Sequence, residues 1–189
     1  MSNFDWMPLK LQEEKSWCVW KIKSQPTSPV TNRRGEWQNN PGTFEEATAF
    51  CKLKSNFKLG YMFTPETEVF GIDFDSCRNP ITGEIESWAK SIIDRFSTYT
   101  EISESKTGVK LIGIGKAEHR TVEFSEKPQY GNHKPHFEVF SDSKYFALTG
   151  DVLDGFTKLE HCQTQLDELV ATLSDQELTG VDRPSLVQR

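Results

Sequence analysis

The chain has 189 residues, 35% of them hydrophobic and 12% aromatic, which is enough for one domain or two small lobes with a sizeable core. Its four cysteines form no CxxC pair, no apolar run approaches a membrane span and the N-terminus lacks a signal-peptide pattern; we therefore expect reduced thiols, a cytoplasmic location and no membrane partner. The formal net charge of −6 excludes a chain that is basic throughout, although residues 151–189, with eight acids and three bases, hold most of the acidity.

Residues 1–16 are polar and predict a short helix or loop before a first strand over 17–22. A loop rich in Pro, Asn, Arg and Gly follows over 25–40. Thr43 is a good N-cap, and Glu46 three residues later completes a capping box, so a helix is expected to run from there to about residue 54.

The second quarter of the chain predicts a hairpin of strands 59–63 and 69–75, then an amphipathic helix over 84–96. The remaining predicted elements are strands 98–102 and 109–114, a polar excursion over 116–135, strand 137–140 with a returning strand 144–150, and a helix over 156–173.

Hairpins that follow helices predict an α+β protein built on mostly antiparallel sheet with flanking helices. A doubly wound parallel sheet would need regular strand–helix alternation, which is not present. No GxxxxGK[ST] motif occurs, so an ATP-driven motor would have to lie outside this chain.

The run GIDFD places two carboxylates on one face of a predicted strand. Side chains alternate along a strand, so Asp73 and Asp75 point one way and Phe74 points the other. Two close carboxylates repel unless a cation lies between them, and hard oxygen ligands suit Mg²⁺ or Mn²⁺. A strand cap, a turn or a calcium site remains open from this pair alone.

Two further segments carry polar groups suited to the same chemistry. Glu138 lies inside an apolar strand, where a carboxylate is costly unless it is paired, ligates a cation or faces water at a sheet edge. The turn over 103–110 combines hydroxyls, a glycine and lysines, and is either a triphosphate cradle or an ordinary exposed hairpin. Lys144 begins a later strand and offers another phosphate contact.

Residues 106–136 hold six Lys or Arg against three Glu, together with three His. Such a local patch can face phosphate in an acidic chain, or be a solvated surface of mixed charge. Aromatic side chains that could stack on bases are more typical of core or loop anchors; they are Trp17, Trp20, Trp37 and Tyr130.

The order GIDFDSC, an amphipathic helix, STYTEISESKTGVKLIGIG and FEVFSDSKYFALTGD resembles the primase–polymerase domain of the archaeo-eukaryotic primase superfamily. The likeness is to the bifunctional domains of phage, plasmid and mobile-element replication proteins, and it covers about residues 15–152. It implies an RRM-like catalytic core over 1–152, followed by a C-terminal helix over 153–173 and a polar tail or linker over 174–189.

The resemblance also implies roles for named residues. Asp73, Asp75 and Glu138 match the family's acidic motifs and would be the catalytic ligands of two Mg²⁺ or Mn²⁺ ions. The nucleotide-binding positions would be Ser103, Ser105, Lys106, Gly108, Lys110 and Lys144, with Lys110 standing where the family has a histidine. Lysine keeps the positive charge at that position but loses the directional imidazole donors.

The activity so implied is template-directed transfer of NTPs or dNTPs to a 3′-hydroxyl, as DNA polymerase, primase or both. Its partners would be a single-stranded DNA template, a primer and a helicase domain or protein outside this chain. Two alternatives stay open: a metal-dependent nuclease, which also uses clustered acids and a lysine, and a catalytically weak module that binds nucleotide or single-stranded DNA.

Overall fold

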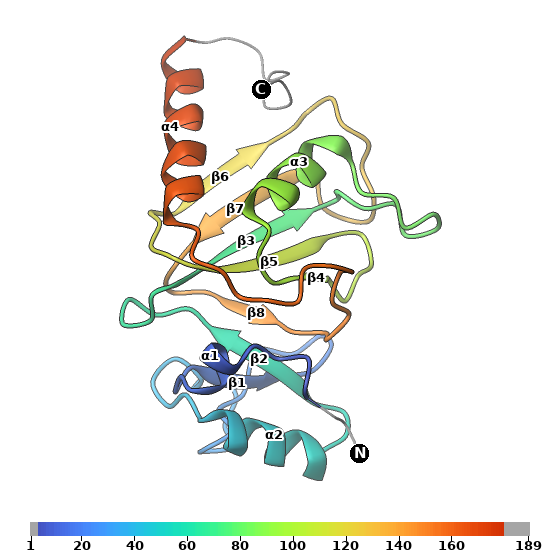
Figure 1. The fold of residues 1–189 in the computed structure, drawn as a ribbon. Helices are drawn as coiled ribbons and strands as arrows, with labels where there is room; N and C mark the ends of the chain where they lie inside the picture. The colour runs from blue at the N-terminus through green and yellow to red at the C-terminus, as the bar shows by residue number, and fades with distance from the viewer. Residues whose placement is uncertain (1–3, 180–189) are drawn as a thin grey trace.

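The computed structural model describes residues 4–179 as an α+β fold of two antiparallel sheets and few helices (Figure 1). The helices are α1 (Leu9–Gln12), α2 (Phe44–Leu53), α3 (Ser87–Phe96) and α4 (Gln163–Thr179). The strands are β1 (Trp17–Trp20), β2 (Lys58–Met62), β3 (Val69–Asp75), β4 (Thr100–Ile102), β5 (Val109–Ile114), β6 (Arg120–Glu123), β7 (His136–Phe140) and β8 (Tyr145–Ala147).

The larger sheet has five strands in the order β4-β5-β3-β7-β6, so the aspartate strand β3 is central. Helices α3 and α4 cover one face of this sheet (Figure 1). The buried side of α3 carries Trp88, Ile92 and Phe96, which recur at helical spacing and pack with Phe74 and other inward residues of β3. This packing fixes which side chains of β3 point away from the helices.

The smaller sheet has the order β1-β2-β8 and packs with α2 around a second core. This core continues onto the other face of the large sheet, where Phe63 and Phe146 approach Gly71 of β3. A Cβ at Gly71 would lie 2.8–2.9 Å from these two rings, closer than side-chain contacts allow. Glycine therefore lets the two sheets meet at one end of β3 and leaves the aspartate end uncovered by this core.

The predicted hairpins 59–63/69–75 and 137–140/144–150 are wrong, because each pair of strands divides between the two sheets. Both edges of β3 are occupied by β5 and β7, so β2 has no place beside it. Instead β2 pairs with β1 and β8, and the turns at 64–68 and 141–144 carry the chain from one sheet to the other.

Other predicted elements differ in extent. The polar excursion 116–135 contains the edge strand β6. Within β6 only Val122 is apolar and buried, so the sequence did not indicate a strand there. The helix expected over 156–173 begins only at Gln163, after an irregular segment, and α4 runs through Thr179 into the expected tail. The capping box at Thr43 is confirmed, with Glu46 N donating to Thr43 Oγ1 at 3.2 Å. The end of the expected tail, 180–189, lies outside the described residues.

The four cysteines are buried free thiols, as expected. Within residues 4–179, no helix combines the length and the apolar composition needed to cross a bilayer.

Candidate active site

A row of polar residues crosses the large sheet on the face turned away from α3. Lys110 of β5 is the register partner of Asp73, which is in turn paired with Glu138 of β7. The row extends to Glu101 of β4 and Thr121 of β6, so Lys110 lies between two acids, Glu101 and Asp73, and Asp73 adjoins a further acid, Glu138. One step along the strands, Asp75 faces His136. The alternation expected for β3 is therefore present, with Phe74 buried on the helix side.

Asp73 is held by Lys110. The lysine Nζ lies 3.0 and 2.9 Å from the two carboxylate oxygens, and it also sits 4.4 Å from the centroid of the Phe146 ring. Its side chain is only 12% exposed. Lys110 was expected to bind triphosphate; in this structure its ammonium is engaged by the aspartate and the ring instead.

Asp75 lies close enough to two histidines, His136 and His133, to feel their charge. Nε2 of His136 is 3.5 Å from a carboxylate oxygen of Asp75. Burial and the neighbouring charge of Asp73 raise the pKa of Asp75, against the lowering effect of His136 and His133. A cation between the two aspartates would offset the repulsion from Asp73.

Glu138 has a lysine and a histidine as hydrogen-bond partners. His119 Nε2 and Lys144 Nζ lie 2.6 and 2.9 Å from the same oxygen, Oε1. Burial opposes ionisation of Glu138, but the hydrogen bonds from Lys144 and His119 outweigh it and lower its pKa. The strand β7 is internal to the sheet, so Glu138 is not a sheet-edge residue.

The serine turn over 103–110 is internally hydrogen-bonded and adjoins the aspartates. Ser103 Oγ accepts from Gly108 N at 3.1 Å, and Ser105 Oγ lies 2.9 Å from the hydroxyls of both Ser103 and Thr107. A Cβ at Gly108 would be 2.5 Å from the Phe74 carbonyl oxygen and 3.6 Å from Asp75 Oδ1. Glycine thus brings the turn against β3 beside the carboxylates.

The lysines near the turn point to different partners. Lys106, at the left-handed φ of 64°, forms a 2.6 Å ion pair with Asp151. Lys144 pairs with Glu138 and is not part of the turn. Its side chain is 44% exposed, so it can leave Glu138 for a more strongly charged partner.

Whether these residues suit a divalent cation depends on their donors and on their arrangement. The donors are carboxylates on one sheet face, which are the ligands that Mg²⁺ and Mn²⁺ prefer. Across the described part of the chain, however, no group of three or more His, Cys, Asp or Glu side chains is arranged to hold a metal ion. Lysines lie beside Asp73 and Glu138, and the His136 imidazole lies 3.5 Å from Asp75, so metal binding requires that these side chains move aside.

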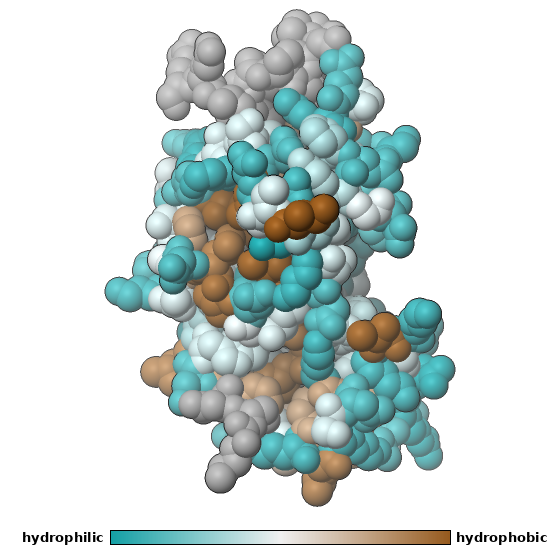
Figure 2. Space-filling view, turned by 90° about the vertical axis from the view of Figure 1, so that its right-hand side faces the viewer, coloured by the Kyte–Doolittle hydropathy of each residue, from teal (hydrophilic) through white to brown (hydrophobic). Residues whose placement is uncertain are grey.

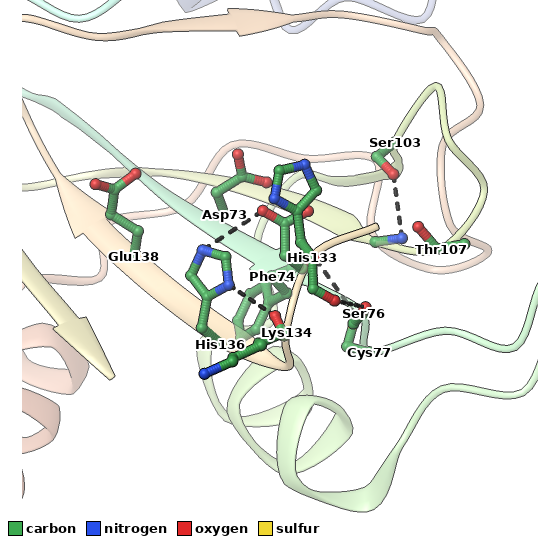
Figure 3. Close-up of polar contacts among 12 residues, drawn as sticks. Asp73, Phe74, Ser76, Cys77, Ser103, Thr107, His133, Lys134, His136 and Glu138 are labelled. Atoms are coloured by element: carbon green, nitrogen blue, oxygen red, sulfur yellow. Dashed lines mark hydrogen bonds and ion pairs between the residues drawn. The ribbon is translucent and has the colours of Figure 1, made fainter. Parts of the chain in front are cut away.

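Sequence reasoning did not place three residues beside the acids, although two of them, His119 and His136, belong to the patch over 106–136. His119 directly precedes β6, and His136 is the first residue of β7. His136 and Glu138 are two residues apart on β7, and this alternation was the signal that their side chains share a face of the sheet. Ser76, at a left-handed φ of 52°, accepts from Tyr130 N at 3.1 Å and donates to backbone carbonyl oxygens in the same loop. It thereby fixes the loop that carries His133 next to the aspartates (Figure 3).

The four aromatic residues considered as base-stacking platforms all have contacts within the fold or are buried in it. Trp17 and Trp20 are buried, as expected for core residues. Trp37 packs on Tyr145 with ring centroids 5.2 Å apart, and the Tyr130 hydroxyl donates to Glu86.

Comparison with known proteins gives one informative similarity. No protein-family model matches the chain. A protein of Nitratiruptor phage NrS-1, named DNA primase-polymerase, is 26% identical over 156 residues, which cover 77% of this chain. They cover 20% of the phage protein, so this chain spans about a fifth of its relative's length. The resemblance to a primase–polymerase domain that the sequence motifs indicate is thereby confirmed.

Proposed function

We propose that this chain is the catalytic domain of a template-directed nucleotidyltransferase, a DNA polymerase, a primase or both, which serves replication of a phage, plasmid or mobile element. The carrying observation is the juxtaposition of Asp73, Asp75 and Glu138 on one sheet face with the serine turn packed beside them. Its similarity to a phage protein named DNA primase-polymerase supports the same reading.

The proposal extends to the fold family and to the domain division. The central antiparallel sheet with helices on one face is compatible with an RRM-like core of archaeo-eukaryotic primases. The catalytic domain would comprise residues 1–152, with the following helix and the terminal segment as appendages.

Asp73, Asp75 and Glu138 would hold Mg²⁺ or Mn²⁺, two ions if the family's pattern applies. When bound, such ions lower the pKa of an attacking 3′-hydroxyl and neutralise phosphate charge. Burial and, after it, the charge of Asp73 raise the pKa of Asp75, so a cation held between the two aspartates would favour the ionised form of Asp75.

Other side chains would orient the nucleotide. Ser103, Ser105 and the backbone at Gly108 would face the triphosphate, because the turn adjoins the carboxylates. Lys144 and Lys106 are exposed enough to exchange their carboxylate partners for phosphate. We assign Lys110 a different task, that of holding Asp73 in position.

The partners would be a single-stranded DNA template, a primer strand and NTPs or dNTPs, with a helicase domain or protein outside the chain. A second candidate, a nucleotide- or DNA-binding module of weak activity, is favoured by one observation. Asp73 and Glu138 each lie 2.9 Å from a lysine ammonium, so two of the three carboxylates already have a cationic partner without metal.

The test is incubation of the chain with a primed template, NTPs or dNTPs, and Mn²⁺. A lengthened primer supports the polymerase, a shortened strand indicates the nuclease, and binding without either change indicates the binding module. A parallel reaction on unprimed template separates primer synthesis from extension.

A further inference from the structure

A cavity of about 670 Å³ lies beside the smaller sheet, and Asp73, Asp75 and Glu138 are not among the residues that line it. Its walls come from the N-terminal segment, the end of α2, the start of β2 and the chain after β8. The side chains that matter here are three aromatic rings, Phe4, Trp6 and Phe57, and two lysines, Lys52 and Lys58. None of the described residues lining it is acidic.

The combination of rings and ammonium groups suits a nucleotide unit. Bases stack on aromatic rings irrespective of sequence, and lysines pair with the adjoining phosphates. The volume lies within the range of ligand pockets and exceeds what a single buried side chain would fill. Figure 2, which faces this side of the molecule, shows recessed apolar surface in its lower part with hydrophilic side chains around it.

Charge complementarity points to a strand of nucleic acid. Residues 17–58 carry seven Lys or Arg and three acids, whereas the whole chain has a net charge of −6. The lysine and ring contacts continue beyond the cavity, since Lys21 lies 5.3 Å from the Phe57 ring centroid and Lys54 lies 4.6 Å from that of Phe50. A track of this kind fits successive phosphates of a strand better than one free nucleotide.

The cavity also adjoins the serine turn. Lys58 on its wall forms an ion pair with Glu104, a residue of that turn, at 2.6 Å. Thr149 on its wall donates its N–H to Glu101 at 2.8 Å, and Glu101 is the register partner of Lys110. A strand seated in the cavity would therefore lie next to the candidate nucleotide site.

We propose that this cavity binds a nucleotide of single-stranded DNA, with its base against Trp6 and Phe57 and its phosphates on Lys52 and Lys58. The inference rests on the proposed function only for the source of that strand, a template or a product. The binding itself needs neither metal nor the carboxylates.

The test measures binding of a fluorescein-labelled oligo-dT of about twelve nucleotides to the whole chain by anisotropy, in EDTA. Phe57→Leu should raise the Kd about tenfold, equivalent to about 1.4 kcal/mol, while Phe57→Tyr keeps the ring and the affinity. Lys52→Ala should lower the salt dependence of binding, whereas Lys90→Ala, which removes an exposed lysine on α3, should leave the Kd nearly unchanged.

A second measurement locates the strand without any substitution. An oligonucleotide containing 5-bromodeoxyuridine is irradiated with the protein, and the attached peptides are identified by mass spectrometry. Attachment near Trp6 or Phe57 supports the proposal. Attachment only elsewhere overturns it, as does loss of the strand on adding dNTP without metal, which would make the cavity a site for free nucleotide.

The two proposals can fail separately. A chain that binds the strand through the cavity but extends no primer leaves the cavity assigned and refutes the polymerase. A chain that extends primers with unchanged strand affinity in Phe57→Leu refutes the cavity assignment and leaves the polymerase intact.

Discussion

Replacing Lys110 by methionine is expected to destabilise the fold, although the substitution adds no polar group. The change removes the cation from Asp73, whose two oxygens lie 2.9 and 3.0 Å from Nζ, and it ends the contact with the Phe146 ring. Asp73 is then left near Asp75 and Glu138 with no lysine between strands β3 and β5 to balance it.

The magnitude follows from how far the pair is buried. Removing one partner of a fully buried ion pair costs about 3–5 kcal/mol, and exposed pairs contribute about 0–1 kcal/mol. The side chains here are 12% and 25% exposed, so about 2–3 kcal/mol of unfolding free energy should be lost. Urea unfolding at neutral pH measures it.

The matched control is Lys90→Met, since Lys90 pairs with Asp94 on the surface of α3, where the side chains are 60% and 49% exposed. Its cost should stay below about 0.5 kcal/mol. Equal effects of the two substitutions would refute the reasoning, because they would show that Asp73 does not depend on its buried cation.

Two further predictions concern the neighbours of this pair. Burial raises the pKa of Glu101, so the contribution of Glu101 to stability is fully present below its ordinary pKa and falls as pH rises through the raised folded pKa. The difference in urea stability between the wild type and Glu101→Gln should therefore shift against the wild type from pH 4 to 7. A pH-independent difference would contradict this cause. Gly108→Ala would place a methyl group 2.5 Å from the Phe74 carbonyl oxygen, so the turn must shift. We expect a loss of about 1–3 kcal/mol in stability and a drop of at least about tenfold in nucleotide incorporation. Wild-type kinetics in this variant would show that the turn is not held against β3.

Much of the local structure follows from short-range patterns in the sequence. Thr43 and Glu46 mark the start of α2, the spacing of Trp88, Ile92 and Phe96 defines α3, and the strand over 109–114 has the predicted bounds. These features depend on neighbours within a few residues.

Strand pairing could not be predicted in the same way. The sequence suggests that β2 pairs with β3 because a short turn joins them, yet β3 pairs with β5 and β7 from later in the chain. Gly71 carries the reason in part, because it admits Phe63 and Phe146 of the smaller lobe against β3, but that contact is visible only in three dimensions.

The candidate site was foreseen to a similar degree. Asp73, Asp75 and Glu138 were predicted as a group from the motif order, and the register places Asp73 opposite Glu138. The partners of these acids were not foreseen, because hydrogen bonds such as Lys110–Asp73 and His119–Glu138 join residues 37 and 19 positions apart. The Lys110–Asp73 pair is the reason we propose Lys110 as a positioning residue for Asp73 in place of the expected phosphate contact.

The central claim is that these carboxylates catalyse nucleotide addition, and Asp73→Ala combined with Asp75→Ala tests it most directly. Incorporation of labelled nucleotide into a primed template with Mn²⁺ is measured for the wild type and the double variant, with circular dichroism to verify that both are folded. We predict that the wild type extends the primer and that the folded double variant incorporates nothing above background. Full incorporation by the double variant would contradict the account.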